Sequence, residues 1–114
     1  MVIVKQGDLF PDIEATVKDE NGVVVDLTGA TVECSMRHSR DPALLLLDAE
    51  LGETVSGFED VGRIRYIWKS GETELDPGTY EAEFKVYPTV GDPFRVPTSG
   101  YIPVVVEARV GSVA

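Results

Sequence analysis

The chain has 114 residues, of which 43% are hydrophobic and 26% charged, and its 20 acidic and 10 basic residues give a formal net charge of −10. This length predicts a single domain over residues 1–114, and the acidic balance argues against nucleic acid as a partner, because binding to a phosphate backbone draws on Lys and Arg. A single cysteine excludes an intramolecular disulfide, and since the longest aliphatic run has five residues and the N-terminus lacks a signal pattern, we expect neither a membrane partner nor a secretory route.

Two strands and a hairpin are predicted near the N-terminus. Residues 2–4 are apolar and predict a short edge strand, and residues 13–18 alternate apolar and polar side chains as a half-buried strand does. Asn21 and Gly22 both accept a positive φ, so this pair between two strand-like runs predicts a hairpin turn. Residues 23–26 are then expected to return beside the first arm.

A longer strand is predicted over residues 30–37. The alternation places three of its side chains inward: Val32, Cys34 and Met36. The pattern weakens over residues 38–60, where the leucine run at residues 44–47 fits either a strand or one turn of helix. The sequence alone leaves the structure of this segment open.

Three more strands are predicted toward the C-terminus. Residues 63–68 place Trp68 on an apolar face, which predicts that the tryptophan lies in the core. Residues 94–96 predict a short strand, and residues 101–110 place alternate apolar side chains on one face. Pro103 lies in this last run, and because proline donates no ladder bond, it predicts a sheet edge or a bulge.

The most regular alternation follows a proline-glycine turn. Pro77 fixes its own φ and Gly78 tolerates a left-handed conformation, so the pair predicts a chain reversal. Beyond the turn, apolar and charged side chains alternate as far as Val86. The spacing from Asp76 to Tyr80 is typical of a tyrosine corner, in which the phenol bonds a backbone group upstream; the alternative is a plain hairpin turn before an amphipathic strand.

The predicted fold is an all-β, immunoglobulin-like β-sandwich of about seven to eight strands. β-Branched residues crowd the periodic segments, and no stretch shows the spacing of a long helix. Gly, Pro, Asn or Asp stands at each reversal, which in a chain of this length favours a sandwich over a closed barrel. Tyr80 at the corner, Trp68 in the core and Gly78 in the turn are the predicted structural residues.

Few residues offer chemistry for catalysis or for binding a cofactor. The single histidine, His38, lies in a polar segment, and the single cysteine, Cys34, lies on the inward face of a strand. Neither a His-rich nor a Cys-rich metal site can be built from them. We therefore predict a protein that is not an enzyme, with no catalytic residue, cofactor or metal.

Two minor alternatives stay open on the sequence alone. Turns favour acidic residues for backbone reasons, but acidic turns in β-sandwich proteins also bind calcium. The acidic residues concerned are Asp19, Glu20, Glu72, Glu74 and Asp76. Tyr87 and Tyr101 are expected to face outward, where aromatic rings can stack on a sugar.

Several segments resemble a known family. They are Lys5-Gln6-Gly7-Asp8, Asn21-Gly22, residues 25–32 (Val-Asp-Leu-Thr-Gly-Ala-Thr-Val), Arg65-Tyr66-Ile67-Trp68, residues 77–84 and Gly100-Tyr101-Ile102. Together they resemble the immunoglobulin-like domain at the N-terminus of tailed-phage baseplate upper proteins, and similar small domains occur in other phage tail proteins. The run at residues 25–32 carries most of the likeness, because the rest is turn and core chemistry that many sandwiches share.

The resemblance implies a structural part of a phage virion, made in the cytoplasm of the host bacterium. Such a part docks on other virion structural proteins, in a symmetric assembly of several copies. Baseplate upper proteins continue into a long region that carries the receptor-binding protein, whereas this sequence ends after its last predicted strand. A tail or baseplate accessory module is the first expectation. The alternatives are a capsid decoration (minor head) protein and a module that binds host-surface glycans.

Docking is expected at strand edges and loops. An exposed edge offers unpaired backbone groups to a neighbouring chain, and four adjacent leucines cannot all face one small core. The alternative for the leucine run is partial burial under a loop. The candidate interface residues are Val2, Ile3, Val4, Leu44, Leu45, Leu46, Leu47 and Val113.

Overall fold

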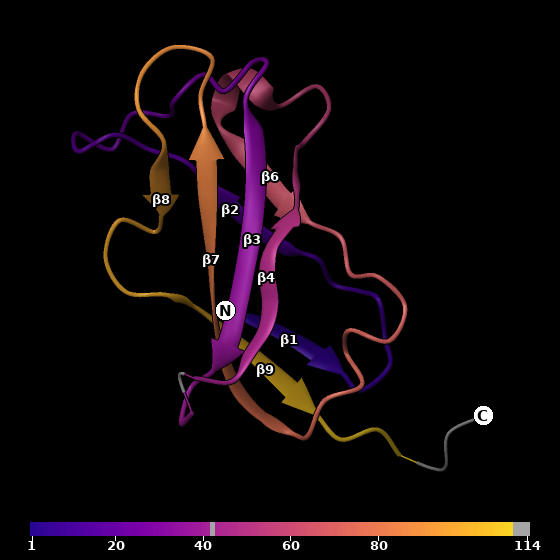
Figure 1. Ribbon diagram of the computed structural model, residues 1–114. Helices are drawn as coiled ribbons and strands as arrows, with labels where there is room; N and C mark the ends of the chain where they lie inside the picture. The colour runs from indigo at the N-terminus through magenta and orange to yellow at the C-terminus, as the bar shows by residue number, and fades with distance from the viewer. Residues whose placement is uncertain (42, 111–114) are drawn as a thin grey trace.

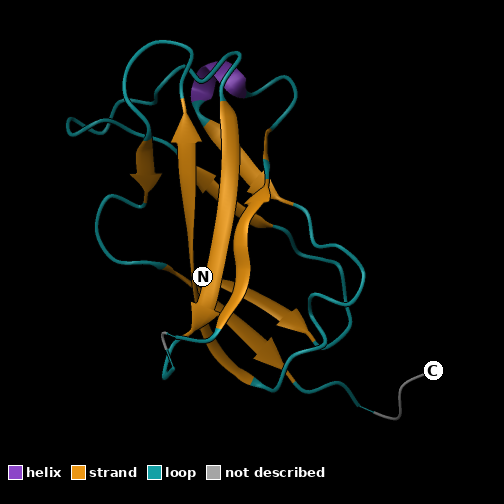
Figure 2. Ribbon diagram, viewed as in Figure 1, coloured by secondary structure: helices purple, strands orange, loops and turns teal. Residues whose placement is uncertain are grey.

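The computed structural model describes residues 1–41 and 43–110, and these form nine strands and one short 3₁₀ turn (Figure 1, Figure 2). The molecule is elongated, with extents of 47 × 29 × 22 Å along its principal axes. The elements are β1 (Val2–Lys5), β2 (Ile13–Thr16), β3 (Thr31–His38), β4 (Leu45–Leu51), β5 (Glu53–Thr54), η1 (Glu59–Val61), β6 (Arg63–Tyr66), β7 (Gly78–Tyr87), β8 (Phe94–Val96) and β9 (Ile102–Glu107).

The strands form two sheets that pack face to face. The larger sheet has the order β1-β9-β7-β3-β4, and the smaller has the order β2-β6-β5. β3 pairs with one edge of β7, while β9 and β8 follow one another along the opposite edge. β1 runs parallel to β9, and the other strand pairs are antiparallel. The predicted all-β sandwich is therefore confirmed, with nine strands in the described residues instead of seven to eight; β5 has two residues.

A single hydrophobic core lies between the sheets. Along β3 and β7 every second side chain is buried, as the sequence alternation predicts. Burial of each Val, Met or Phe side chain among them stabilises the fold by roughly 1.5–3 kcal/mol. The predicted inward residues that the structure confirms are Val32, Cys34, Met36, Ile64, Tyr66, Trp68, Tyr80, Ala82, Phe84 and Val86.

The tyrosine corner is present at the start of β7. The hydroxyl of Tyr80 donates a hydrogen bond of 2.6 Å to the carbonyl oxygen of Asp76, and the ring is buried. Gly78 differs from the prediction, because its φ of 158° is close to extended and it is the first residue of β7. The corner therefore depends on the phenol rather than on a left-handed glycine.

The hairpin after β2 has a different turn from the one predicted. Asp19 and Val23 are joined by a backbone hydrogen bond of 2.8 Å, and Gly22 donates to the carbonyl of Asp19 at 3.0 Å. Gly22 has a positive φ of 79°, whereas Asn21 is not among the residues with positive φ. This pattern is a three-residue loop with glycine in the left-handed position, not a two-residue turn. The return arm pairs with the residues that follow β2, through a bridge between Lys18 and Val24 and a hydrogen bond of 3.0 Å from the N–H of Val25 to the carbonyl of Val17.

The segment that carries most of the family resemblance folds as a turn that anchors a leucine. The carboxylate of Asp26 accepts hydrogen bonds from the backbone N–H and the hydroxyl of Thr28, at 2.9 and 2.6 Å. Leu27, between them, is buried and donates its N–H to Glu59 in η1. Gly62 follows η1 with a φ of 73°, and a Cβ there would lie 2.7 Å from the carbonyl oxygen of Val17. Close backbone packing at this end therefore requires glycine.

The leucine run belongs to the edge strand β4. Two register shifts interrupt its pairing with β3, and Ala49 has a positive φ of 51° in the first of them. The N–H of Ala49 donates to the hydroxyl of Ser35 at 3.0 Å instead of to a carbonyl. Such bulges bend an edge strand and make it a poor template for further pairing.

The last strand is shorter than predicted. β9 ends at Glu107, and Ala108 and Val110 are exposed rather than part of the core face. The reason lies in the partner strand. β7 begins at Gly78, and Gly78 pairs with Val106. The residues after Val106 in the last strand therefore lie beyond the start of β7 and have little of it to pair with. Pro103 lies just before the β1 pairing begins at Val104, so its missing N–H interrupts no bond to β1.

Replacing Tyr80 with Phe is expected to lower the free energy of unfolding by about 1–2 kcal/mol, because the bond to Asp76 is lost while the ring stays buried. Tyr87→Phe is the matched control: it removes a hydroxyl that bonds Glu33 on the half-exposed outer face, and should cost less. Urea denaturation of both variants measures the difference. Equal losses would contradict a special role for the corner.

Stability is expected to fall as the pH rises above about 9. Burial, with smaller contributions from Glu72 and Glu83, raises the pKa of the Cys34 thiol from 9.0 to about 12. The folded chain therefore keeps a proton that the unfolded chain releases, which lowers the free energy of unfolding by about 2 kcal/mol near pH 10.5. Burial also raises the pKa values of Tyr66 and Tyr80, which acts in the same direction. Urea titrations at several alkaline pH values should show a shallower decline for Cys34→Ala than for the wild type, and parallel curves would contradict this cause.

Candidate docking surfaces

The predicted N-terminal edge is present, but its side chains divide between core and solvent. β1 lies at the end of the larger sheet and pairs only with β9 (Figure 1). The side chains of Val2 and Val4 are buried in the core, so they cannot themselves contact a partner. Ile3 is 47% exposed on the outer face and is the apolar side chain that β1 presents to solvent. The docking role of this edge stays a prediction.

The leucine run divides in a similar way. Leu44 and Leu45 are about half exposed, Leu46 is partly buried against the core, and Leu47 is 2% exposed within it. The expectation that four adjacent leucines cannot share one core is therefore confirmed. Val113, predicted with them as an interface residue in the tail at residues 111–114, lies outside the described residues.

Trp68 connects the segment before β2 to the central strand of the smaller sheet, β6. The indole N–H donates to the carbonyl of Pro11 at 2.8 Å, and the indole meets the ring of Tyr66 edge to face. The hydroxyl of Tyr66 in turn donates to the carboxylate of Glu72, at 2.7 and 2.8 Å to its two oxygens. Trp68 is therefore structural, as predicted, with each of its polar partners inside the chain.

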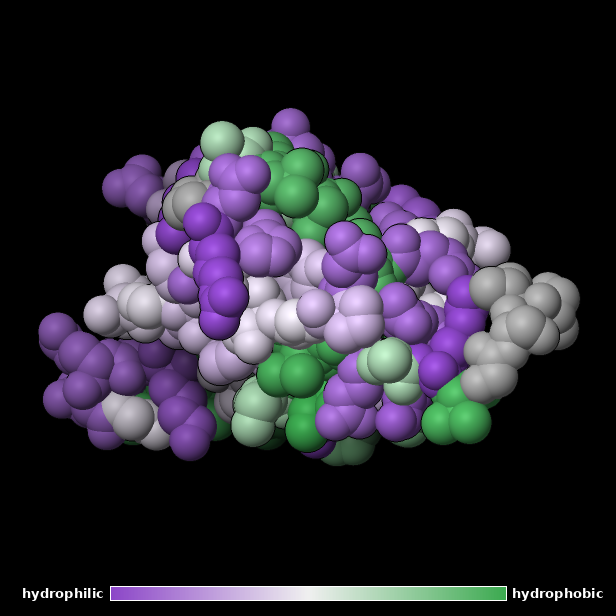
Figure 3. Space-filling view, turned by 90° about the horizontal axis from the view of Figure 1, so that it is seen from below, coloured by the Kyte–Doolittle hydropathy of each residue, from purple (hydrophilic) through white to green (hydrophobic). Residues whose placement is uncertain are grey.

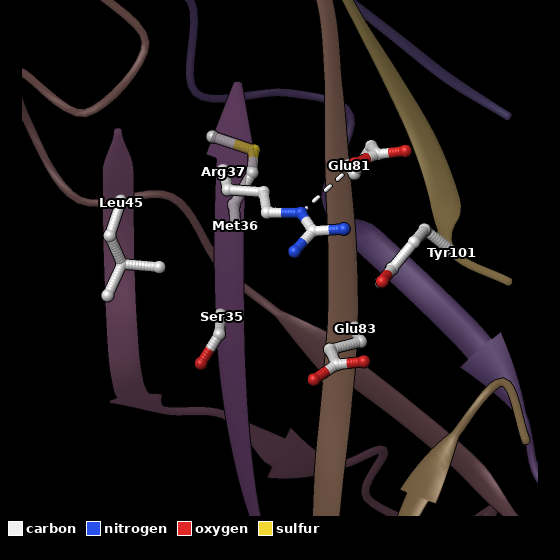
Figure 4. A pocket seen from close by; sticks show the side chains of 7 residues that line it. All are labelled: Ser35, Met36, Arg37, Leu45, Glu81, Glu83 and Tyr101. Carbon is white, nitrogen blue, oxygen red and sulfur yellow. Dashed lines mark hydrogen bonds and ion pairs between the residues drawn. The ribbon is translucent and has the colours of Figure 1, made fainter. Parts of the chain in front are cut away.

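A shallow hollow of about 190 Å³ lies on the outer face of the larger sheet (Figure 4). Arg37 reaches across β7, where its Nε donates to Glu81 at 3.1 Å and its guanidinium lies 4.5 Å from the ring centre of Tyr101. The bond to Glu81 raises the pKa of Arg37, which stays charged. The hollow is lined by Ser35, Met36, Arg37, Leu45, Glu81, Glu83 and Tyr101.

Paired charges cover the outer faces of both sheets. Seven of the ten basic residues pair with seven different acids, which leaves three bases and thirteen acids outside the ion pairs of the described residues. Each exposed pair contributes roughly 0–1 kcal/mol to stability. The cross-strand pairs are Lys5–Glu107, Arg37–Glu81 and Arg95–Glu83 on the larger sheet, and Arg63–Glu14 and Arg65–Glu53 on the smaller. The flat faces therefore offer a partner few unpaired bases.

The acidic turns do not assemble into a ligand set. Asp19 accepts backbone hydrogen bonds from the hairpin turn, Glu72 accepts the Tyr66 hydroxyl, and Glu74 pairs with Arg109 at 3.0 Å. Over residues 1–41 and 43–110, no group of three or more His, Cys, Asp or Glu is placed to hold a metal ion. The polar atoms of these residues serve local turns and tertiary contacts.

The remaining candidates have structural surroundings. The ring of His38 meets that of Tyr80 edge to face at 5.2 Å, and its Nδ1 accepts the N–H of Arg40 at 3.0 Å. Cys34 is fully buried. Tyr101 is 42% exposed as predicted, but Tyr87 is half-buried and bonds Glu33, and neither forms a ring pair with another described aromatic residue.

Sequence reasoning missed the Arg37–Glu81–Tyr101 cluster. Both charged residues were assigned outward positions, but 44 residues separate them and their register was unknown. The signal in the sequence was that charged residues occupy the outward positions of both strands. If two such strands are neighbours, an Arg on one and a Glu on the other favour an ion pair.

Seen from below, hydrophobic surface is broken into small areas separated by polar residues (Figure 3). This end of the molecule includes β1 and β9 (Figure 1). This face therefore has no extended apolar patch. A partner protein that binds there has to contact backbone groups and small apolar areas together.

No protein-family model matches the sequence, and no curated protein is significantly similar to it. Within the described part of the chain, no helix has the length and apolarity needed to span a membrane. The phage family that the sequence resembles therefore stays a prediction, and the all-β sandwich is the established property of the chain.

Proposed function

We propose that this chain is a structural module of a tailed-phage virion, a tail or baseplate accessory that docks on other virion proteins. The resemblance of residues 25–32 to the domain of baseplate upper proteins supports the phage assignment. The same residues form the turn that inserts Leu27 beneath η1, so the shared segment is one on which this sandwich depends.

The open edge of β1 is the observation that supports docking best. It combines unpaired backbone groups with the exposed side chain of Ile3, and a neighbouring strand can add to such an edge. The outer faces carry cross-strand ion pairs, which a flat protein contact would have to desolvate at a cost. Edges are therefore better suited than faces for attachment to a larger assembly.

Mass spectrometry of gradient-purified particles tests the virion role. In particles of the phage that encodes the chain, we expect the protein at a constant ratio to the major structural proteins, and we expect it to remain after further purification. An abundant host protein of similar mass serves as the control for contamination. Presence in the lysate with loss from purified particles, in parallel with the host protein, would contradict the proposal.

Separated heads and tails distinguish the two positions that a virion module can take. A tail or baseplate accessory is expected to sediment with tails from a mutant that makes no heads. Recovery with heads alone would instead identify a capsid decoration protein and overturn the tail assignment.

A further inference from the structure

The edges of the two sheets differ in how ready they are to pair with another strand. β4 is bulged twice, with Ala49 in a left-handed conformation, and β5 has two residues. β8 is three residues long between Pro93 and Pro97, and β2 carries Glu14. β1 pairs with β9 in unbroken register over four residues and contains no acid. Among the described strands it is the edge least protected against pairing.

The backbone of β1 fixes which residues face outward from the sheet. The N–H of Gln6 donates to the carbonyl of Glu107 in β9 at 2.9 Å. Because backbone groups alternate in direction along a strand, those of Val2 and Val4 also point to β9, and those of Ile3 and Lys5 point to the free edge. The carbonyl of Lys5 is already used, since it accepts the N–H of Asp8 at 3.0 Å. Ile3 is therefore the residue of β1 with both backbone groups open.

We propose that β1 pairs with β1 of a second copy of this chain, antiparallel and centred on Ile3. In an antiparallel pair, residues with outward backbone groups exchange two hydrogen bonds when they lie opposite each other. A two-fold axis through Ile3 lets the two Ile3 residues do this, and it places Lys5 opposite Met1 of the second copy. An axis at Val4 would instead set Ile3 opposite Lys5 of the second copy, whose carbonyl already accepts the N–H of Asp8. An axis at Lys5 would oppose two like charges and a used carbonyl.

The side chains agree with this register. Opposite residues in an antiparallel pair point to the same face, so the two Ile3 side chains meet on the outer face of a continuous sheet. Ile3 lies beside Val105, which is half-buried, so the contact joins two small apolar areas into one. The buried Val2 and Val4 stay in their own cores, and neither core has to open.

Charge also favours this edge as the place where two acidic copies meet. Each copy has a net charge of −10, which opposes contact in general. β1 has no acid, and the acid of its neighbour β9, Glu107, pairs with Lys5 at 3.4 Å. Asp8, whose N–H bonds the carbonyl of Lys5 at the end of this edge, is an acid outside the ion pairs, and it follows the segment that would pair. Charges more than about 8–10 Å apart are largely screened at physiological salt.

The association is expected to be weak for free copies. One four-residue edge buries less than the roughly 1,200 Å² of a stable interface. Copies held near each other on a symmetric scaffold would pair far more, because their effective concentration is high. The pairing stands on strand geometry alone and does not depend on the virion role.

Cysteine crosslinking tests the register directly. In the proposed pair only the residue on the axis faces its own copy, with the two Ile3 Cα atoms about 5.5 Å apart. A short bismaleimide should therefore link Ile3→Cys into dimers on the order of ten times faster than two controls. Lys5→Cys is on the same edge and face, but its copies lie about 14 Å apart in this register. Leu51→Cys is 71% exposed on the opposite edge strand. Wild type gives the background from the buried Cys34.

Each outcome decides the proposal. Fast linking of Ile3→Cys alone supports it. A far-ultraviolet circular dichroism spectrum of the linked dimer then checks that the sandwich is intact. Equal rates for the three variants would show random collision, and fastest linking at Lys5→Cys would show another register; either result overturns the proposal. Failure here with the protein still present in purified particles would leave the virion role standing.

Discussion

The larger sheet depends on β7, whose two edges are both paired. β3 covers one edge, and β9 and β8 divide the other between them. Its apolar side chains are at most 2% exposed and alternate with charged ones, so a slip of one residue would put Glu81 or Glu83 into the core. The bond from Tyr80 to Asp76 fixes where this strand begins. The tyrosine corner therefore sets the position of β7, and the alternation of apolar and charged side chains along β7 sets the register of the sheet.

Strands with one buried face could be predicted because their signal is local. β3, β6 and β7 have a period of two, and each inward residue contributes to the core independently of how distant strands pair. The tyrosine corner was predictable for a similar reason, since donor and acceptor are four residues apart. The division of the leucine run followed from the same counting of faces.

The features that were missed depend on partners far away in the sequence. The indole of Trp68 bonds a carbonyl 57 residues away, and Arg37 pairs with Glu81 only in the register that β3 and β7 adopt. The first bulge of β4 lies where the hydroxyl of Ser35 replaces a carbonyl as acceptor, which no periodicity signals. Val110 continues a perfect alternation, yet it is exposed because β7 begins opposite Val106. A local pattern states which face is apolar but not whether a partner strand is there to cover it.

The distribution of charge gives the edges of this sandwich unequal roles. β2, β4 and β5 each carry acids; Glu14, Glu50 and Glu53 are ion-paired, whereas Asp48 of β4 is not, so a second copy that approaches β4 meets an unpaired negative charge. β1 itself contains no acid, and its Lys5 pairs with Glu107 of the neighbouring β9. A strand edge without acids exposes a free protein to unwanted pairing with other chains. Its retention in an otherwise well-protected sandwich is easier to explain if the edge is used, and β1 is the edge where backbone, side chain and charge all allow it.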